Sequence, residues 1–274
     1  MTAATLNLSQ RFPAKRAFIT GAASGLGLAC AEWLAREGWR LVLTDVDEAR
    51  LSLVADSLAR EGAQVAAAPC DVRDAAALTR LVDDAVSAIG GIDVALHCAG
   101  VATAGSFTGS APEDWQWVFD INVHGTVNSC RAVVPHMQRQ RTGGVIVNIA
   151  SAASFVTNSH MSSYNAAKAA VVALSETLMQ ELAQHDIQVT AAMPGFFRTR
   201  LLESARGPEK TVAGARRVME DSNLSAEVVA DALLTAVARG QTHFVYPGRY
   251  RTLWRLKRLM PAYFQKLVPR LLRR

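Results

Sequence analysis

The sequence is poor in charged and aromatic residues and has only four cysteines. Of its 274 residues, 19% are charged, 7% are aromatic and 50% are hydrophobic. So much apolar material can bury a sizeable core, which excludes a disordered chain. The cysteines, at positions 30, 70, 98 and 130, form no Cys-x-x-Cys pair and have no histidine at metal-ligand spacing. We therefore expect reduced thiols, no metal site and a reducing, cytoplasmic location.

No segment has the composition of a membrane span or of a secretory signal. Residues 142–167 lack Asp, Glu, Lys and Arg, but they contain three asparagines, several serines and two glycines. These polar residues argue against a span through the bilayer core. The N-terminus has no long apolar stretch before Arg11, which argues against a signal peptide.

Acidic residues are missing from the end of the chain. Residues 249–274 hold nine of the 29 basic residues and no Asp or Glu. The rest of the chain has 20 basic and 24 acidic residues, so the net charge of +5 belongs to the tail. We expect no nucleic-acid-binding face on the body. The predicted organisation is one domain over 1–248, followed by a basic amphipathic tail over 249–274.

The tail fits two different roles. Its apolar residues recur at helical spacing with basic residues between them, at Leu253, Leu256, Leu259, Met260, Tyr263 and Leu267. This pattern is typical of a helix on an anionic membrane surface. It equally suits a tail packed on its own subunit or on a neighbour. Pro261 and Pro269 are expected to divide it into short pieces.

Short apolar runs alternate with helical stretches along the body. Continuous apolar runs are typical of strands buried on both faces of a parallel sheet. The predicted strands are 17–20, 40–45, 64–68, 92–98, 145–150, 187–193 and 242–246. The predicted helices are 25–37, 47–61, 74–89, 113–140, 162–185 and 225–239. This alternation predicts an α/β Rossmann fold, with a doubly wound, mostly parallel seven-stranded sheet.

A glycine-rich turn follows the first predicted strand. Glycines suit a sharp turn where a Cβ would block a pyrophosphate, and the next helix offers free N–H groups. The residues expected to bind the dinucleotide here are Gly21, Ser24, Gly25, Leu26 and Gly27. Asp45 ends the second strand and could accept hydrogen bonds from both ribose hydroxyls, while repelling a 2′-phosphate. Asp45 therefore favours NAD over NADP, unless it only caps the following helix.

Tyr164 and Lys168 lie four residues apart in a predicted helix and so share one face. A nearby ammonium favours the phenolate and is expected to lower the pKa of Tyr164. The phenol could then exchange a proton with an alcohol or ketone while a nicotinamide exchanges hydride.

Together these motifs resemble the short-chain dehydrogenase/reductase family over roughly residues 13–247. Further matches lie at the family's spacing, at Asp71, Val72, Gly100, Asn122, Ser151, Pro194, Gly195 and Thr199. The resemblance implies that Tyr164 is the general acid/base and that Lys168 assists it and holds the nicotinamide ribose. It implies that Ser151 binds the substrate oxygen and that Asn122 holds a relay water. Asp71 and Val72 would contact adenine, and Thr199 the carboxamide. The resemblance also implies that Gly100, Tyr164, Pro194 and Gly195 contribute to cofactor binding.

One motif departs from the family pattern. The family usually has Asn-Asn-Ala-Gly after the fourth strand, whereas this chain has His97-Cys98-Ala99-Gly100. The glycine turn is kept, but a thiol replaces an amide that ties neighbouring strands together. We expect a slightly looser cofactor floor and retained activity.

The substrate end is expected to be mostly apolar. By resemblance, 200–223 forms a lid, and the expected substrate contacts are Ser151, Ala153, His160, Phe196 and Phe197. An alcohol or ketone on a lipophilic skeleton fits such a lining. The predicted function is an NAD-dependent alcohol dehydrogenase or ketone reductase, in a homodimer or homotetramer paired through 113–140 and 162–185. The alternatives are an NADP-dependent ketone or 3-oxoacyl reductase, and a non-catalytic dinucleotide-binding regulator.

Overall fold

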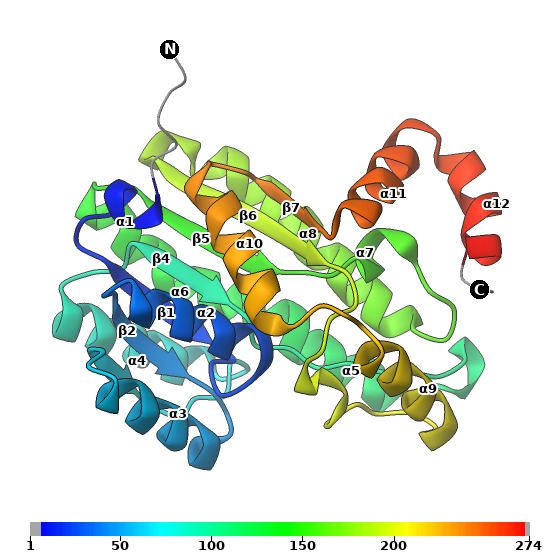
Figure 1. Ribbon diagram of the computed structural model, residues 1–274, viewed down its shortest axis with the longest axis horizontal. Coiled ribbons are helices and arrows are strands. Elements are labelled where there is room, and N and C mark those ends of the chain that lie inside the picture. The colour runs from blue at the N-terminus through cyan, green and yellow to red at the C-terminus, as the bar shows by residue number, and fades with distance from the viewer. Residues whose placement is uncertain (1–6, 272–274) are drawn as a thin grey trace.

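The computed structural model describes residues 7–271, with side chains to residue 267. It contains one seven-stranded sheet in the order β3-β2-β1-β4-β5-β6-β7, and each neighbouring pair is parallel (Figure 1). The strands are β1 (Arg16–Thr20), β2 (Arg40–Thr44), β3 (Val65–Ala67), β4 (Val94–His97), β5 (Gly144–Ile149), β6 (Ile187–Pro194) and β7 (His243–Tyr246). All seven predicted strands exist, and the predicted Rossmann architecture is confirmed.

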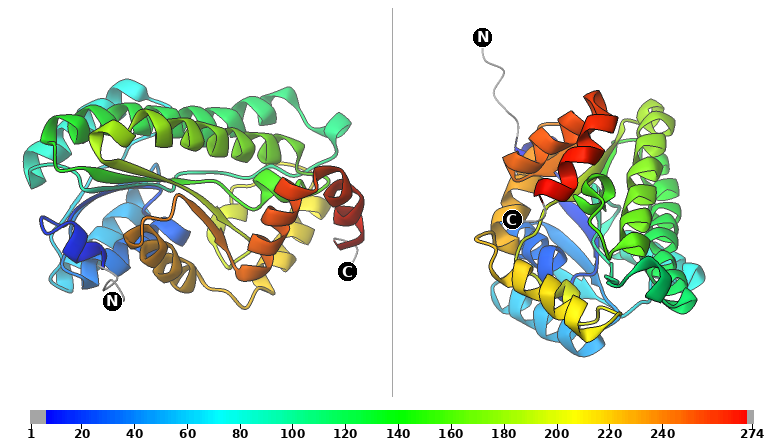
Figure 2. Two further views of the ribbon diagram at one scale, coloured as in Figure 1. Left: turned by 90° about the horizontal axis from the view of Figure 1, so that it is seen from above. Right: turned by 90° about the vertical axis from the view of Figure 1, so that its right-hand side faces the viewer.

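Helices cover both faces of the sheet, as Figure 2 shows edge-on. One face carries α2 (Gly25–Arg36), α3 (Glu48–Arg60) and α10 (Ala226–Ala238). The other carries α4 (Ala75–Ile89), α6 (Gly125–Gln140) and α8 (Ser162–Glu181). The central strands are almost fully buried between these layers, which explains their continuous apolar runs.

The predicted single helix 113–140 is wrong in one respect. It consists of α5 (Pro112–Phe119) and α6, joined by a π-helical turn, η2 (Asp120–His124). Apolar periodicity continues through such a turn, so the sequence pattern gave no sign of it. The wider turn carries Asn122, whose side chain bonds the backbone of the neighbouring loop instead of lying on a helix surface.

Apart from the 12-residue α9, the remaining elements of the body are short. They are α1 (Leu8–Arg11), α7 (Ala153–Val156), α9 (Glu209–Glu220) and the 3₁₀ turns η1 (Phe107–Gly109), η3 (Ala183–His185) and η4 (Arg200–Leu202). Both α9 and η4 lie in the segment 200–223 that was predicted to form a lid.

The basic tail forms two helices, α11 (Gly248–Leu259) and α12 (Pro261–Leu271). The predicted break occurs at Pro261, but Pro269 lies inside α12, so the second predicted break is wrong. Proline lacks an N–H, and near a helix end this removes a single backbone bond. Residues 272–274 of the predicted tail lie outside the described residues. Among the described helices, none is long and apolar enough to cross a bilayer.

Candidate active site

A cavity of about 1630 Å³ opens at the carboxyl ends of the strands. The strand order reverses between β1 and β4, where the following loops diverge and leave a crevice. The cavity runs from Asp45 and Asp71 past Tyr164 and Lys168 to Phe196 and the inner side of α9. Ligand sites commonly measure about 300–1,000 Å³. This cavity therefore has room for a dinucleotide and a second molecule.

The glycine-rich turn forms one wall of the cavity. Gly21 and Gly25 have φ values of 65° and 56°, which other residues rarely adopt. A Cβ at Gly27 would overlap the carbonyl oxygen of Gly21. Ser24 is the N-cap of α2, yet its side chain makes no capping hydrogen bond. The hydroxyl of Ser24 and the N-terminal N–H groups of α2, whose first residues include Leu26, thus line the cavity, where they fit an anionic pyrophosphate.

Asp45 lies at the end of β2 and faces the same cavity. Its carboxylate accepts hydrogen bonds from the backbone N–H of Ala23 at 3.0 Å and of Asp47 at 3.1 Å. Asp47, and not Asp45, is the N-cap of α3. The alternative reading of Asp45 as a simple helix cap is therefore wrong. Asp45 joins the glycine-rich turn to the start of α3 and keeps its negative charge at the cavity wall.

Asp71 and Val72 line the far end of the cavity, after β3. The carboxylate of Asp71 is held by Arg73, with Nη2 at 2.5 Å from Oδ2, and this pairing lowers the pKa of Asp71. Val72 is buried and packs where a Cβ on Gly125 would overlap it. Both residues sit where the resemblance expects the adenine.

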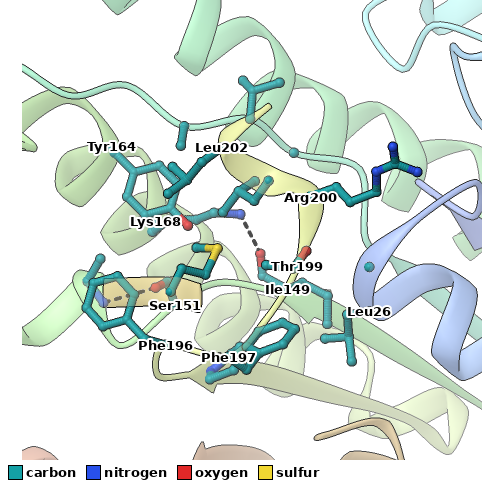
Figure 3. A pocket seen from close by; sticks show the side chains of 18 of the residues that line it. Leu26, Ile149, Ser151, Tyr164, Lys168, Phe196, Phe197, Thr199, Arg200 and Leu202 are labelled. Carbon is teal, nitrogen blue, oxygen red and sulfur yellow. Dashed lines mark hydrogen bonds between the residues drawn. The ribbon is translucent and has the colours of Figure 1, made fainter. Parts of the chain in front are cut away.

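Ser151, Tyr164 and Lys168 meet at the centre of the cavity (Figure 3). Ser151 follows β5, and the other two lie in the first turns of α8. The Nζ atom of Lys168 lies 5.8 Å from the centre of the Tyr164 ring. Tyr164 is only 5% exposed and Lys168 only 4%, so the fold buries both a phenol and an ammonium group. The predicted i, i+4 pairing on one helix face is therefore present in the folded chain.

Lys168 donates a hydrogen bond from Nζ to the Ile149 carbonyl oxygen at 2.8 Å. An ammonium has three N–H donors, and within residues 7–271 the Ile149 carbonyl is its one hydrogen-bond acceptor. Gly100 leaves the ammonium accessible, because a Cβ there would lie 3.4 Å from Nζ. Ribose hydroxyl oxygens would satisfy the remaining donors, so this part of the site fits a nucleoside.

Asn122 is fully buried beside Gly100. Its Oδ1 accepts from the Val101 N–H at 2.8 Å, and its Nδ2 donates to the Val101 carbonyl at 2.9 Å. The side chain therefore fixes the loop after β4. Its backbone carbonyl accepts from the Thr126 hydroxyl at 2.8 Å.

The predicted lowering of the Tyr164 pKa is wrong for the protein without ligands. Burial raises the pKa of Tyr164 to about 12, and the nearby Ser151 hydroxyl opposes this only in part. Burial also lowers the pKa of Lys168 to about 8. Removal from water disfavours both charged forms more than their neighbours stabilise them. At neutral pH the phenol is protonated.

Thr199, Pro194 and Gly195 line the cavity between the central triad and α9. Thr199 is the N-cap residue of η4, yet its side chain makes no capping hydrogen bond. Its Oγ1 lies 2.5 Å from where a Cβ on Gly25 would be. Thr199 therefore spans from the sixth strand's loop to the glycine-rich turn. Its hydroxyl does not cap η4.

All of the expected substrate contacts line the cavity: Ser151, Ala153, His160, Phe196 and Phe197. His160 is exposed and has a φ of 61°, whereas Ala153 is buried. The sequence analysis missed three residues of the tail, Arg249, Tyr250 and Leu253, which line the same end. A Cβ on Gly195 would overlap the ring of Tyr250. No motif marks this contact, since it depends on how α11 packs.

A second missed feature is an ion cluster beside the cofactor end of the cavity. Glu203 lies 2.6 Å from Arg200 Nε and 3.4 Å from Arg50 Nη2. Arg50 belongs to α3 and the other two to the η4 region, so the cluster joins segments from both halves of the chain. Its members are 42–53% exposed, which limits its contribution to stability.

His97 occupies the position where the family pattern departs. Its Nδ1 lies 2.8 Å from Asn148 Oδ1 on β5, and Asn148 also donates to Ser175 at 3.0 Å. His97 thus ties β4 to β5, and burial lowers the pKa of its imidazole to about 4. The strands keep a side-chain connection without the family's amide. In the described part of the chain no cluster of His, Cys, Asp and Glu could hold a metal ion.

Comparison with known proteins connects this geometry to a family. The family model described as short chain dehydrogenase matches residues 15–210. A 2,3-dihydro-2,3-dihydroxybenzoate dehydrogenase from Bacillus subtilis is 35% identical over 208 residues, which is 76% of this chain and 78% of that protein. The oxidoreductase UcpA from Salmonella typhimurium is 35% identical over 190 residues, covering 69% and 72% of the two chains.

Solved structures of short-chain dehydrogenases are also similar to this chain. A short-chain dehydrogenase/reductase from Burkholderia phymatum in complex with NAD has a TM-score of 0.83 and 33% identity, covering 89% of this chain and 92% of that one. A short-chain dehydrogenase from Mycobacterium paratuberculosis bound to NAD has a TM-score of 0.76 and 28% identity, covering 88% and 97%.

Proposed function

The chain belongs to the short-chain dehydrogenase/reductase family of oxidoreductases, and on that premise we propose that it interconverts a secondary alcohol and a ketone with NAD(H). The observation that carries the proposal is the convergence of Ser151, Tyr164 and Lys168 on a cavity that also holds the glycine-rich turn. A protein that only bound a dinucleotide would have no need of a buried phenol beside a buried ammonium.

The residues along the cavity fit a dinucleotide from end to end. Asp71 and Val72 would hold the adenine end, the glycine-rich turn the pyrophosphate, and Lys168 and Thr199 the nicotinamide end. When bound, the nicotinamide would supply or accept hydride. Gly100 and Asn122 hold open the space beside the Lys168 ammonium.

Tyr164 would handle the proton in both directions. With a pKa of about 12 the phenol is protonated at neutral pH, so it can donate its proton to a developing alkoxide when a ketone is reduced. Ser151 would donate a hydrogen bond to the same substrate oxygen and orient it. In the oxidative direction Tyr164 must first lose its proton, which the ammonium of Lys168 favours.

The substrate class follows from the cavity lining. Ala153, Phe196, Phe197, Tyr250 and Leu253 present mostly apolar surface around the reacting position. An apolar ligand binds such walls favourably because it buries apolar surface against them. A secondary alcohol or ketone on a lipophilic skeleton is the class we propose.

Asp45 supports NAD over NADP. Its carboxylate would accept from ribose hydroxyls and repel a 2′-phosphate. The two similar structures from Burkholderia and Mycobacterium were each solved with NAD. We also propose that copies of the chain pair through the outer faces of α6 and α8, which lie side by side on one surface of the sheet (Figure 2).

The proposal is tested by the change in NADH absorbance with a panel of secondary alcohols and ketones, with NAD and NADP in parallel. Tyr164→Phe should lower turnover about a hundredfold to ten-thousandfold, because it removes the proton-transfer group and little else. The matched control is Tyr263→Phe, which alters an exposed phenol on the tail.

Each other result has a definite meaning. Faster turnover with NADP would refute the role given to Asp45 and favour the NADP-dependent reductase. Tight NADH binding without turnover of any substrate, or full turnover by Tyr164→Phe, would refute the catalytic assignment and favour a binding protein.

A further inference from the structure

The two tail helices have one face on the protein and another exposed face that is basic. Phe264 of α12 is fully buried in a cluster with Phe155, Val156 and Met193. Lys257 of α11 donates to the Phe155 carbonyl oxygen at 2.9 Å. The tail is therefore held on its own subunit. Leu253 and Leu256, two of the six residues of the apolar stripe expected from the sequence, are turned inward and partly buried.

The outward face carries positive charge along its length. Arg251, Arg255 and Arg258 recur at helical spacing on α11 and are exposed. Lys266 is exposed on α12. Arg258 is partly compensated by Glu176 at 3.3 Å, and residues 249–274 contain no acidic residue. The tail itself thus contributes only positive charge to this face, and Glu176 of α8 offsets part of it at Arg258.

Large apolar side chains are exposed at the corner between the two helices. Leu259 is 81% exposed, Met260 51% and Tyr263 53%. Three such residues within five positions contrast with Leu253, Trp254, Leu256 and Phe264, whose side chains pack inward. Apolar residues flanked by arginine and lysine are the arrangement that enters the boundary between lipid headgroups and acyl chains. An exposed apolar patch of this kind marks an interaction surface.

We propose that the α11–α12 corner docks on the surface of an anionic phospholipid bilayer. Its basic residues would contact lipid phosphates, while Leu259, Met260 and Tyr263 would insert at the headgroup level. Neither helix exceeds 12 residues, so the contact lies on the membrane and does not cross it. Charge complementarity and the apolar corner together select this partner.

The docking face adjoins the cavity. The first turn of α11 supplies Arg249 and Tyr250 to the cavity wall, and the next supplies Leu253. Figures 1 and 2 show α11 and α12 at the same end of the molecule as α7 and α9, which surround the substrate end. Docking would bring the cavity mouth close to the bilayer. Delivery of a lipophilic substrate from the bilayer would follow, a consequence that rests on the proposed function.

The test is co-sedimentation of the full chain with vesicles of phosphatidylcholine alone or with phosphatidylglycerol added. We expect binding only to the anionic vesicles, weakening as salt is raised. Each basic residue contributes about a fivefold change in partitioning. Arg251→Ala/Arg255→Ala should therefore reduce binding about thirtyfold, and Leu259→Ser about tenfold. Because vesicle binding is measured without turnover, its failure is distinguishable from failure of the proposed function.

Arg80→Ala and Leu53→Ser are the matched controls, since they change an exposed arginine on α4 and a 69% exposed leucine on α3. Both should bind vesicles like the unaltered chain. No sedimentation with anionic vesicles, or equal sedimentation with neutral ones, would overturn the proposal. So would binding to a DNA duplex that depends on the arginines and not on Leu259. A change of oligomeric state in Leu259→Ser, measured by light scattering, would instead assign the corner to a subunit interface.

Discussion

Lys168 is a charged side chain that the fold removes almost completely from water. Burial lowers its pKa from 10.5 to about 8, a change that corresponds to about 3 kcal/mol of lost stability while the lysine is charged. Between these two pH values the unfolded chain binds more protons than the folded chain, so stability rises with pH in this window. The site therefore keeps a destabilising charge, to which we have assigned a role in the proposed chemistry.

We predict that Lys168→Met abolishes turnover and stabilises the protein. The variant removes the buried charge, which raises the free energy of unfolding. It also loses the hydrogen bond to Ile149, which cancels about 1 kcal/mol of that gain. The net gain at pH 7 should be about 2 kcal/mol, measured by urea unfolding. The gain should shrink as pH rises to 9.5, below the range in which Tyr164 titrates.

Lys168→Arg is the control, because it keeps the charge and should keep the low stability. A Lys168→Met variant that is less stable than the unaltered protein at pH 7, with the same pH dependence, would contradict this account of the site.

The sequence predicted residues that the fold brings to one cavity, but it did not predict their electrostatics. Tyr164 and Lys168 share a helix face because of a spacing of four, and spacing is visible in the sequence. The pKa of Tyr164 depends on whether the nearby ammonium or burial has the larger effect. Burial is set by how the whole chain folds, and no local sequence pattern predicts it. His97 was likewise read as a departure from a motif, and its tie to Asn148 appears only when β4 and β5 are in register.

At the scale of elements, the sequence patterns predicted well which strands and helices exist, and they predicted poorly where one helix ends and the next begins. The seven strands follow from apolar runs, whereas the π turn at Asp120–His124 interrupts a periodicity that looks continuous. The tail shows the same limit. Its helical spacing was visible, but the side that faces the protein was not, because Phe264 finds its partners in α7, more than 100 residues earlier.

Phe264 anchors α12, and we predict that Phe264→Ala releases it. Removing a fully buried phenylalanine costs about 3 kcal/mol or more, which should speed amide hydrogen exchange in α12 about a hundredfold. The neighbouring Tyr263→Ala removes a side chain that is 53% exposed and should change exchange little. Equal exchange in the two variants would show that α12 is held by something other than this contact.

At the scale of the whole molecule, the site depends on both halves of the sheet. The glycine-rich turn, Asp45 and Asp71 follow β1, β2 and β3, while Ser151 and Thr199 follow β5 and β6. A dinucleotide along this cavity would join loops from strands on either side of the β1–β4 reversal. Binding should therefore stabilise the whole fold and not a single segment.

We predict that NAD raises the thermal unfolding temperature more than NADP does. A ligand present at 100 times its Kd adds about 2.7 kcal/mol, or a few degrees for a chain of this size. Tyr164→Phe should keep most of this shift although it loses turnover, because it removes one hydroxyl, the proposed proton-transfer group, and leaves the other cofactor-binding residues unchanged. Asp45→Asn keeps the shape of the side chain and removes its charge. It should therefore reduce the difference between the unfolding-temperature shifts that NAD and NADP produce. An equal or larger shift with NADP in the unaltered protein would mean that Asp45 does not govern the choice. Arg50, which lines the same cavity and pairs with Asp47, would then be the residue to examine.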